Sequence, residues 1–246
     1  MPQATSSTDA AATRRQYSLA NGTGYWRSEF HRAAADGPAV QPQAFLVEQE
    51  PDSTILPHFH VQNQFQIIVA GGGRLGKHPV RPVSVHYAGA HTPYGPIVSG
   101  PEGLSYFTLR DGFDPGARFM PGARAELARV RRRFLLADEL AVEPPEALRS
   151  RRGAAVETVI APEADGLAAM LLRAGPEVQT TGPDPAAGGG QYHLVLAGTL
   201  RHERRDLPVN SCLFVARGDP PPGIAAGPEG LQLLILQFPH RHDGAA

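Results

Sequence analysis

The chain has 246 residues, which is enough for one large domain or for two domains of about 100–120 residues each. Its formal net charge of −1 and its lack of a basic stripe argue against nucleic acid as a partner. No stretch approaches the ~18 consecutive apolar residues of a membrane span, so we expect no membrane partner either. The single cysteine, Cys212, excludes an intramolecular disulfide and favours the reducing environment of the cytoplasm.

Both ends of the chain are predicted to be tails. Residues 1–15 are rich in Ala, Ser and Thr and lack the apolar segment of a signal peptide, so we expect a disordered N-terminal tail. Residues 241–246 are expected to form a second tail.

Between the tails the sequence predicts short strands separated by turns, in keeping with its 27 glycines and 24 prolines. Strand-like segments lie at 64–70, 83–87, 104–109, 191–197, 210–216 and 231–238. The best helix candidate, residues 123–133, follows Pro121 and is composed mainly of good helix formers. We therefore predict an all-β protein in which a short helical linker, residues 121–152, joins two domains.

An internal repeat supports the two domains. The segment from Gln64 to Gly71 matches the segment from Gln191 to Gly198, and the offset in numbering, 191 minus 64, is 127. The sequence Gly-Pro-Glu-Gly-Leu at 100–104 recurs at 227–231, where 227 minus 100 gives the same offset. Two matches in one register indicate a duplication, with domains at 16–120 and 153–240.

The pair His58-Phe59-His60 precedes the first repeated strand. Residues two apart in a strand point to the same face, so the two imidazoles could share a metal ion. With Gln64 and Gly71, the pair forms the pattern H-x-H-x3-[E/Q]-x6-G, which resembles the first motif of the cupin family, where Glu is usual at the position of Gln64. Together with the duplication, this pattern makes the chain similar to bicupins. The resemblance implies two tandem jelly-roll barrels, also called double-stranded β-helices.

The second cupin motif is present in altered form. It is usually P-x-G-x2-H, and its histidine would fall at Thr92, whereas this chain has His91 one place earlier. A one-residue slip in a strand turns a side chain to the opposite face. Either a local bulge turns His91 inward, or the third histidine ligand is missing.

The resemblance implies a divalent metal held by His58, His60 and Gln64, with His91 as an uncertain fourth ligand. Imidazole suits Fe, Zn, Ni, Cu and Mn, so the sequence does not select one of these metals. The neutral amide of Gln64 is a poorer ligand than a carboxylate. Copy two lacks the site, since Pro185 and Ala187 occupy the positions that the repeat offset assigns to the two histidines.

Two functions follow from these residues. The first is a metal-dependent cupin enzyme of the dioxygenase, isomerase or lyase type, acting on a small polar molecule in the N-terminal barrel. Tyr94, His86 and Gln66 would orient the substrate or move protons. The alternative is a non-catalytic protein that binds or senses a small ligand with weak or no metal, which the altered motifs favour. A structural bicupin with an empty barrel is a third reading. The resemblance also suggests a homodimer.

Overall fold

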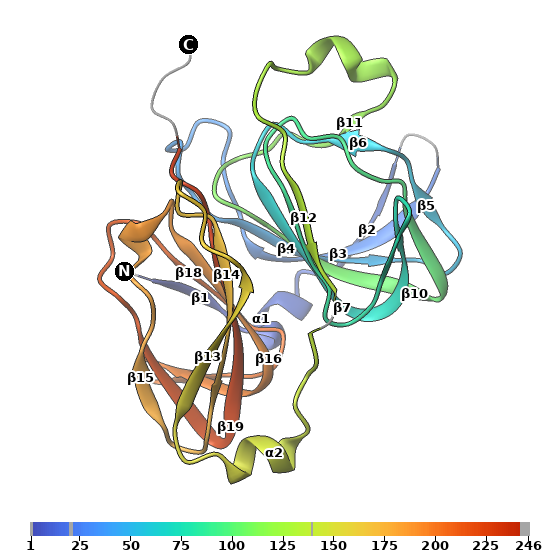
Figure 1. Ribbon diagram of the computed structural model, residues 1–246. Coiled ribbons are helices and arrows are strands. Elements are labelled where there is room, and N and C mark those ends of the chain that lie inside the picture. The colour runs from blue at the N-terminus through green and yellow to red at the C-terminus, as the bar shows by residue number, and fades with distance from the viewer. Residues whose placement is uncertain (1, 20–21, 139, 242–246) are drawn as a thin grey trace. The chain divides into compact units, whose positions relative to one another are not determined.

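The computed structural model describes residues 2–19, 22–138 and 140–241. Its contacts divide the chain into two units (Figure 1). Residues 10–141 form the N-terminal unit, and residues 142–246 together with residues 1–9 form the C-terminal unit. Both units consist mainly of antiparallel strands, which confirms the predicted all-β class.

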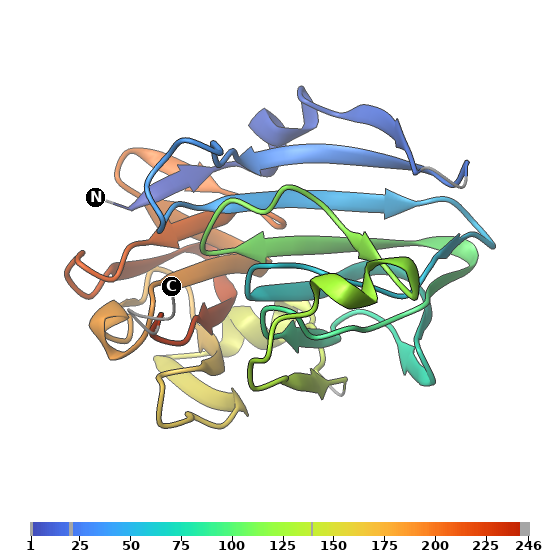
Figure 2. The same ribbon diagram turned by 90° about the horizontal axis from the view of Figure 1, so that it is seen from above.

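The N-terminal unit is built on one large sheet. Its strands are β2 (Arg15–Ser18), β3 (Gly24–His31), β4 (Gln43–Gln49), β5 (Thr54–Ile55), β7 (Gln64–Leu75), β8 (His78–Val80), β9 (Val85–Ala88), β10 (Ile97–Arg110) and β12 (Phe134–Ala137). They run in the order β12-β9-β7-β10-β4-β3-β2, with β5 beside β10 and β8 beside β7. Figure 2 shows β3, β4 and β10 lying side by side. A separate pair, β6 (His58–Phe59) and β11 (Arg118–Phe119), carries the first histidine.

The alternation of side chains along β10 places several polar residues on one face of the strand. Tyr106, Thr108 and Arg110 are two residues apart, so they share one face of the strand. On neighbouring β7 their register partners are Ile68, Gln66 and Gln64. Polar residues are thus concentrated at one end of this face.

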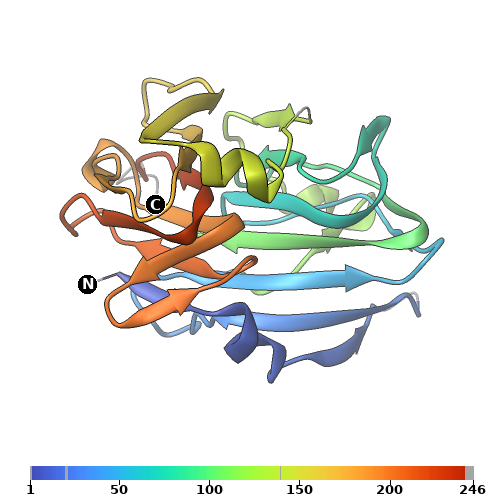
Figure 3. The same cartoon turned by 90° about the horizontal axis from the view of Figure 1, so that it is seen from below.

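The C-terminal unit repeats the same strand order. Its strands are β1 (Gln3–Thr5), β13 (Ala154–Ile160), β14 (Ala168–Ala174), β15 (Gln179–Thr181), β16 (Gln191–His202), β17 (Arg205–Leu207), β18 (Cys212–Val215) and β19 (Gly223–Gln237). The order β18-β16-β19-β14-β13 corresponds to β9-β7-β10-β4-β3 of the first sheet. Figure 3 shows the long strands β16 and β19 together.

The start positions of three strands support the duplication. β16, β17 and β18 begin at 191, 205 and 212, whereas β7, β8 and β9 begin at 64, 78 and 85, so every pair has the offset found in the sequence repeat. The second unit has an apolar core cluster that includes the fully or almost fully buried Leu172, Val195, Leu213, Leu233 and Ile235.

The N-terminal segment differs from the predicted disordered tail. Gln3–Thr5 pairs with Cys212–Phe214, because the edge of β18 offers unpaired backbone groups to another strand. The short helix α1 (Ser7–Ala11) follows, and its Ala10 is 1% exposed. Arg15–Ser18 then joins the N-terminal sheet as β2. At the other end, residues 242–246 of the predicted tail lie outside the described residues.

The linker also differs from the prediction. Instead of a helix over 123–133, a single 3₁₀ turn covers Gly122–Glu126, and Phe134–Ala137 adds strand β12 to the N-terminal sheet. Residues 129–133 are mainly exposed, so a helix there would have had no apolar face to bury. The linker helix is α2, which covers Pro145–Ser150. None of the helices in the described part of the chain has the length and apolar character that a membrane span needs.

Candidate functional site

A cavity of about 180 Å³ lies in the N-terminal unit, against the polar end of the β10 face. Side chains from several strands and from the loop after β10 line it. Five of its polar lining residues are joined by hydrogen bonds or ion pairs, and Thr108 lies beside them; the five are His58, His60, Tyr94, Arg110 and Asp114. All six are less than 9% exposed, so the cluster is held inside the barrel wall.

His58 is oriented by its backbone neighbour. Its Nδ1 lies 2.7 Å from the carbonyl oxygen of Leu56, and its Nε2 lies 2.9 Å from the hydroxyl of Tyr94. Burial lowers the pKa of His58 to about 4, so the ring is neutral near pH 7. A neutral ring bound in this way donates from Nδ1 to the carbonyl and accepts from Tyr94 at Nε2.

His60 belongs to a buried charged group. Its Nδ1 donates to Asp114 Oδ1 over 2.8 Å, and Arg110 Nη2 lies 3.1 Å from Nδ1 and 3.2 Å from Nε2 of the ring. Burial, followed by the charge of Arg110, lowers the pKa of His60 to about 3. Burial raises the pKa of Asp114, but the His60 hydrogen bond and the Arg110 charge outweigh it and hold that pKa at about 2. A neutral imidazole thus lies between an ionised carboxylate and a guanidinium.

Arg110 connects this group to Gln64. It donates to Gln64 Oε1 from Nε over 3.1 Å and from Nη2 over 3.0 Å, and to Gln43 Oε1 over 2.8 Å. Its Nη1 lies 3.6 Å from Asp114 Oδ1. The amide nitrogen of Gln64 donates to the Tyr94 hydroxyl. Both ends of the Gln64 amide are therefore engaged.

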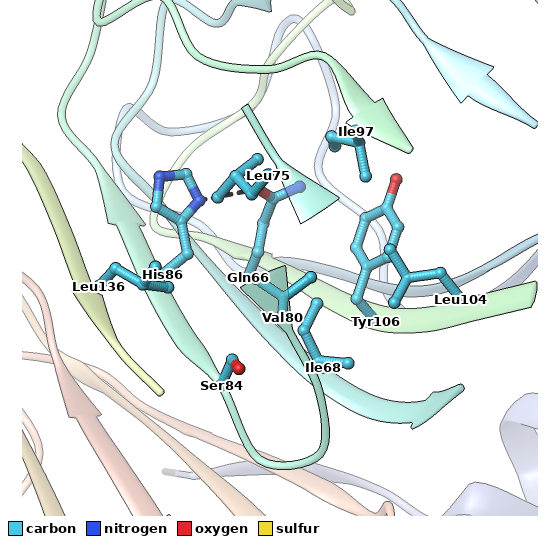
Figure 4. Close-up of a pocket in the computed structure, with 10 residues that line it drawn as sticks. All are labelled: Gln66, Ile68, Leu75, Val80, Ser84, His86, Ile97, Leu104, Tyr106 and Leu136. Atoms are coloured by element: carbon cyan, nitrogen blue, oxygen red, sulfur yellow. Dashed lines mark hydrogen bonds between the residues drawn. The ribbon is translucent and has the colours of Figure 1, made fainter. Parts of the chain in front are cut away.

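Gln66 and His86 lie deeper in the barrel. Figure 4 shows their hydrogen bond, in which His86 Nδ1 lies 2.9 Å from Gln66 Oε1. A second, much smaller cavity of about 10 Å³ lies there among mainly apolar side chains. Gln66 and Tyr106 line both cavities, and so mark the boundary between the polar and apolar parts of the interior.

His91 does not join the other predicted ligands. Its φ of 57° lies in the left-handed region, so the backbone is irregular at the point where the sequence motif slips. The side chain is directed elsewhere: His91 Nδ1 accepts from the amide of Ala128 at 3.3 Å, and the ring lies 5.5 Å from that of Phe59. The neighbouring Thr92 hydroxyl accepts from the amide of Arg133 at 3.1 Å. Both side chains therefore anchor the 128–133 segment.

The structure brings together His58, His60, Gln64 and Tyr94. Gln66 and His86 lie next to this group, since the His86 ring is 5.0 Å from that of Tyr94 and Gln66 lines the same cavity. Sequence reasoning missed Arg110 and Asp114. A signal for Arg110 was present, because a charged residue two positions from Thr108 and four from Tyr106 must share their inward face. Asp114 lies beyond the strand, where no periodicity applies.

The predicted donor set can be tested against a divalent metal. His58 Nε2 accepts from Tyr94 and Gln64 Oε1 accepts from Arg110, so two of the three acceptor atoms already have donors. Arg110 Nη2 also lies 3.2 Å from the third, His60 Nε2. Among the described residues, no group of three or more His, Cys, Asp or Glu side chains is placed to share a metal ion. A guanidinium beside two of these three atoms also repels a second cation. In this arrangement the residues do not fit a divalent metal.

The C-terminal unit has an uncharged version of the same pair. Gln191 and Gln237 are the repeat equivalents of Gln64 and Arg110, and they are also register partners. Gln191 Nε2 donates to Gln237 Oε1 over 2.7 Å, and His193 Nε2 lies 2.9 Å from Gln191 Oε1. The polar pair is thus common to both units, whereas the charge is specific to the first.

The chain was compared with family models, with curated proteins and with solved structures, and the solved structures identify its fold. No family model matches the sequence, and no curated protein matches it. Among solved structures, a dioxygenase candidate from Nostoc punctiforme matches with a TM-score of 0.68 at 12% identity, over 100% of this chain and 85% of that one. Oxalate decarboxylase from Bacillus subtilis matches with a TM-score of 0.59 at 13% identity, over 98% and 77%. These neighbours are cupin-type proteins.

The fold is of the cupin type. A third neighbour, a bacterial pirin from Escherichia coli solved with nickel(II), matches with a TM-score of 0.57 at 14% identity, over 98% of this chain and 100% of that one. At such identities the likeness concerns the fold, so the function of this chain has to be argued from its own side chains.

Two buried histidines predict a pH dependence of stability. Burial lowers the pKa of His86 and of His193 from 6.5 to about 3. Above about pH 6.5 each of these rings is neutral both in the folded and in the unfolded protein. Between pH 6.5 and 3 the unfolded chain binds protons that the folded chain does not. The free energy of unfolding therefore decreases as the pH is lowered through this range, by about 1.4 kcal/mol per pH unit for each such histidine.

Urea unfolding measured at pH 7 and pH 5 checks this expectation. The variant His193→Leu should lose stability less steeply than wild type over that interval, and the two slopes should coincide between pH 7 and pH 8. Equal slopes between pH 7 and pH 5 would show that His193 is protonated in the folded protein.

Proposed function

We propose that the N-terminal unit is a binding site for a small polar molecule, which occupies the cavity beside Arg110. The observation that carries this proposal is the cavity of about 180 Å³, whose wall includes a hydrogen-bonded polar cluster rather than an apolar core alone. Polar groups that are fixed before the ligand arrives give specificity and lose little entropy on binding.

The contrast between the two units supports the proposal. Thr108 lines the cavity, whereas its repeat equivalent, Ile235, is part of the apolar core of the C-terminal unit. Arg110 is likewise replaced there by Gln237. The second unit therefore provides a fold without the charged binding groups.

A ligand screen with a blocked cavity tests the proposal. At least one class of small polar compound should stabilise the wild-type protein against thermal unfolding. At a free ligand concentration of a hundred times Kd, the free energy of unfolding should increase by about 2.7 kcal/mol. The variant Thr108→Phe should lose this gain, because the larger side chain fills the cavity. Thr181→Phe, the same substitution at an exposed position of the C-terminal unit, serves as the control. An equal gain in both variants would place the ligand outside the cavity.

A metal-dependent enzyme of the dioxygenase, isomerase or lyase type is the second candidate. One observation favours it: an oxygen acceptor holds Nδ1 of both His58 and His60, as is usual for histidines that bind a metal through Nε2. For the metal to bind, Tyr94 and Arg110 would have to leave the acceptor atoms that they occupy.

Elemental analysis distinguishes the two candidates. After expression with added Fe, Zn, Ni, Cu and Mn, the second candidate requires stoichiometric metal in wild type and none in the double variant His58→Ala/His60→Ala. Equal, sub-stoichiometric metal in both proteins is the result that the first candidate predicts. The homodimer and the cytoplasmic location remain predictions.

A further inference from the structure

We infer that Arg110 takes the place of a metal as the cation of this site, so that the cavity binds a small carboxylate without any metal ion. This inference rests on the proposed function and specifies its ligand class. The position of Arg110 carries it, since the guanidinium donates to Gln64 Oε1 and its Nη2 lies 3.1 and 3.2 Å from the two ring nitrogens of His60. It thus contacts two of the three side chains that the sequence assigns to the metal.

The charges around the cavity favour an anion. Arg27 and Arg110 both line it, and their guanidinium carbons lie 3.6 and 5.5 Å from the centre of the Phe45 ring. Asp114 is the one carboxylate among the lining residues of this cavity in the described chain. Glu29, the ion-pair partner of Arg27 at 2.6 Å, does not line it. Two cationic side chains and one anionic side chain therefore line the cavity, and Glu29 compensates part of the charge of Arg27 through a second contact, to Nη2 at 3.0 Å.

Asp114 is engaged within the wall rather than directed at a ligand. It accepts from His60 Nδ1 at 2.8 Å and from the amides of Val61 and Gly116 at 3.0 and 2.9 Å. These bonds fix the carboxylate, which in turn fixes the guanidinium of Arg110. Gln64 and Gln43 hold the remaining donors of the guanidinium, so its position is fixed before a ligand arrives and its positive charge attracts a carboxylate in the cavity.

The size of the cavity limits the ligand. About 180 Å³ is below the ~300–1,000 Å³ of pockets that take drug-sized molecules, so a small acid fits and a nucleotide does not. The hydroxyls of Thr108 and Tyr106 add further donors to the wall. Apolar side chains, among them Val47 and Ile55, also line the cavity and would contact the remainder of the acid.

Calorimetric titration of chelator-treated protein tests the inference, with benzoate and propionate as probes and benzamide and propionamide as their neutral counterparts. We expect at least one of the acids to bind, with at least about tenfold higher affinity than its amide. The double variant Arg110→Gln/Asp114→Asn should lose this preference. It removes both charges together, which a folded protein tolerates better than the loss of one. Arg110→Lys, which keeps the charge, should retain part of the preference.

A variant designed to gain metal binding provides a second, independent test of the inference. The variant Gln64→Glu/Arg110→Gln/Asp114→Asn supplies the carboxylate of the cupin motif, removes the competing cation and leaves no unpaired carboxylate at position 114. It should bind more divalent metal than wild type in elemental analysis, and it should lose the preference for the acid.

Three results would overturn the inference. They are equal affinity for acid and amide, acid binding that appears only when metal is added back, and no binding of either acid. If amides bind as well as acids but Thr108→Phe abolishes both, the proposed function stands and only the ligand class fails. If Thr108→Phe leaves the ligands of the screen bound, the proposed function fails as well.

Discussion

Replacing Asp114 with alanine should lower the free energy of unfolding of the N-terminal unit by about 3–5 kcal/mol, because the change leaves the Arg110 guanidinium buried without its carboxylate. The Arg110 side chain is 4% exposed and that of Asp114 is fully buried, so both charges are shielded from bulk water. The variant also removes the acceptor of His60 Nδ1. Urea unfolding followed by the fluorescence of Trp26 measures the effect, since this single tryptophan of the chain lies in β3 of the N-terminal unit.

The comparison variants make this result specific. Glu126→Ala breaks an exposed ion pair with Arg118 in the same unit and should cost no more than about 1 kcal/mol. Arg110→Gln/Asp114→Asn should cost clearly less than Asp114→Ala, because it leaves no unpaired charge. A loss as small in Asp114→Ala as in Glu126→Ala would mean that the ion pair is not buried in the protein.

Alanine at Gly71 should destabilise the N-terminal unit by more than about 4 kcal/mol, which is beyond the range of ordinary substitutions. Gly71 has a φ of +68°, and a Cβ added there would lie 2.2 Å from the carbonyl oxygen of Gly103. Gly198 is its equivalent, with a φ of +70° and a Cβ that would lie 2.0 Å from the oxygen of Gly230. The two clashes involve rigid backbone, so the chain cannot relax cheaply.

The two substitutions report on different units. Gly71→Ala should shift the transition seen by Trp26, and Gly198→Ala should shift a transition of the C-terminal unit seen by circular dichroism. Gly122→Ala and Gly153→Ala are matched controls, one in each unit, because an added Cβ meets nothing within 4 Å at either position. If Gly198→Ala behaved like Gly153→Ala, the strand equivalence between the units would be in doubt.

The repeat was the part of the fold that could be predicted best. Gln64 and Gln191 begin equivalent strands because the same alternation of turn glycines and apolar residues follows each of them. The N-terminal strand Gln3–Thr5 could not be predicted, since its pairing depends on the edge of β18, a strand from the opposite end of the chain. The helix expected over 123–133 failed because helix propensity acts weakly where no apolar face is buried.

The candidate site was predicted only in part. His58 and His60 could be identified from the sequence, because they are two residues apart and form a recognisable His-x-His pattern. Arg110 comes from β10 and Asp114 from the loop that follows it, and only the folded sheet brings them to His60. The sequence therefore indicated a site with histidines, whereas the charges that define its chemistry depend on contacts between segments that are distant in the chain.

A crystal structure of the protein grown with benzoate would test the central claim most directly. The account predicts the carboxylate in the N-terminal cavity, within hydrogen-bond distance of the Arg110 guanidinium, with no anomalous scattering peak between His58 and His60. A metal ion bound to these two histidines, with Arg110 turned away from Gln64, would contradict it.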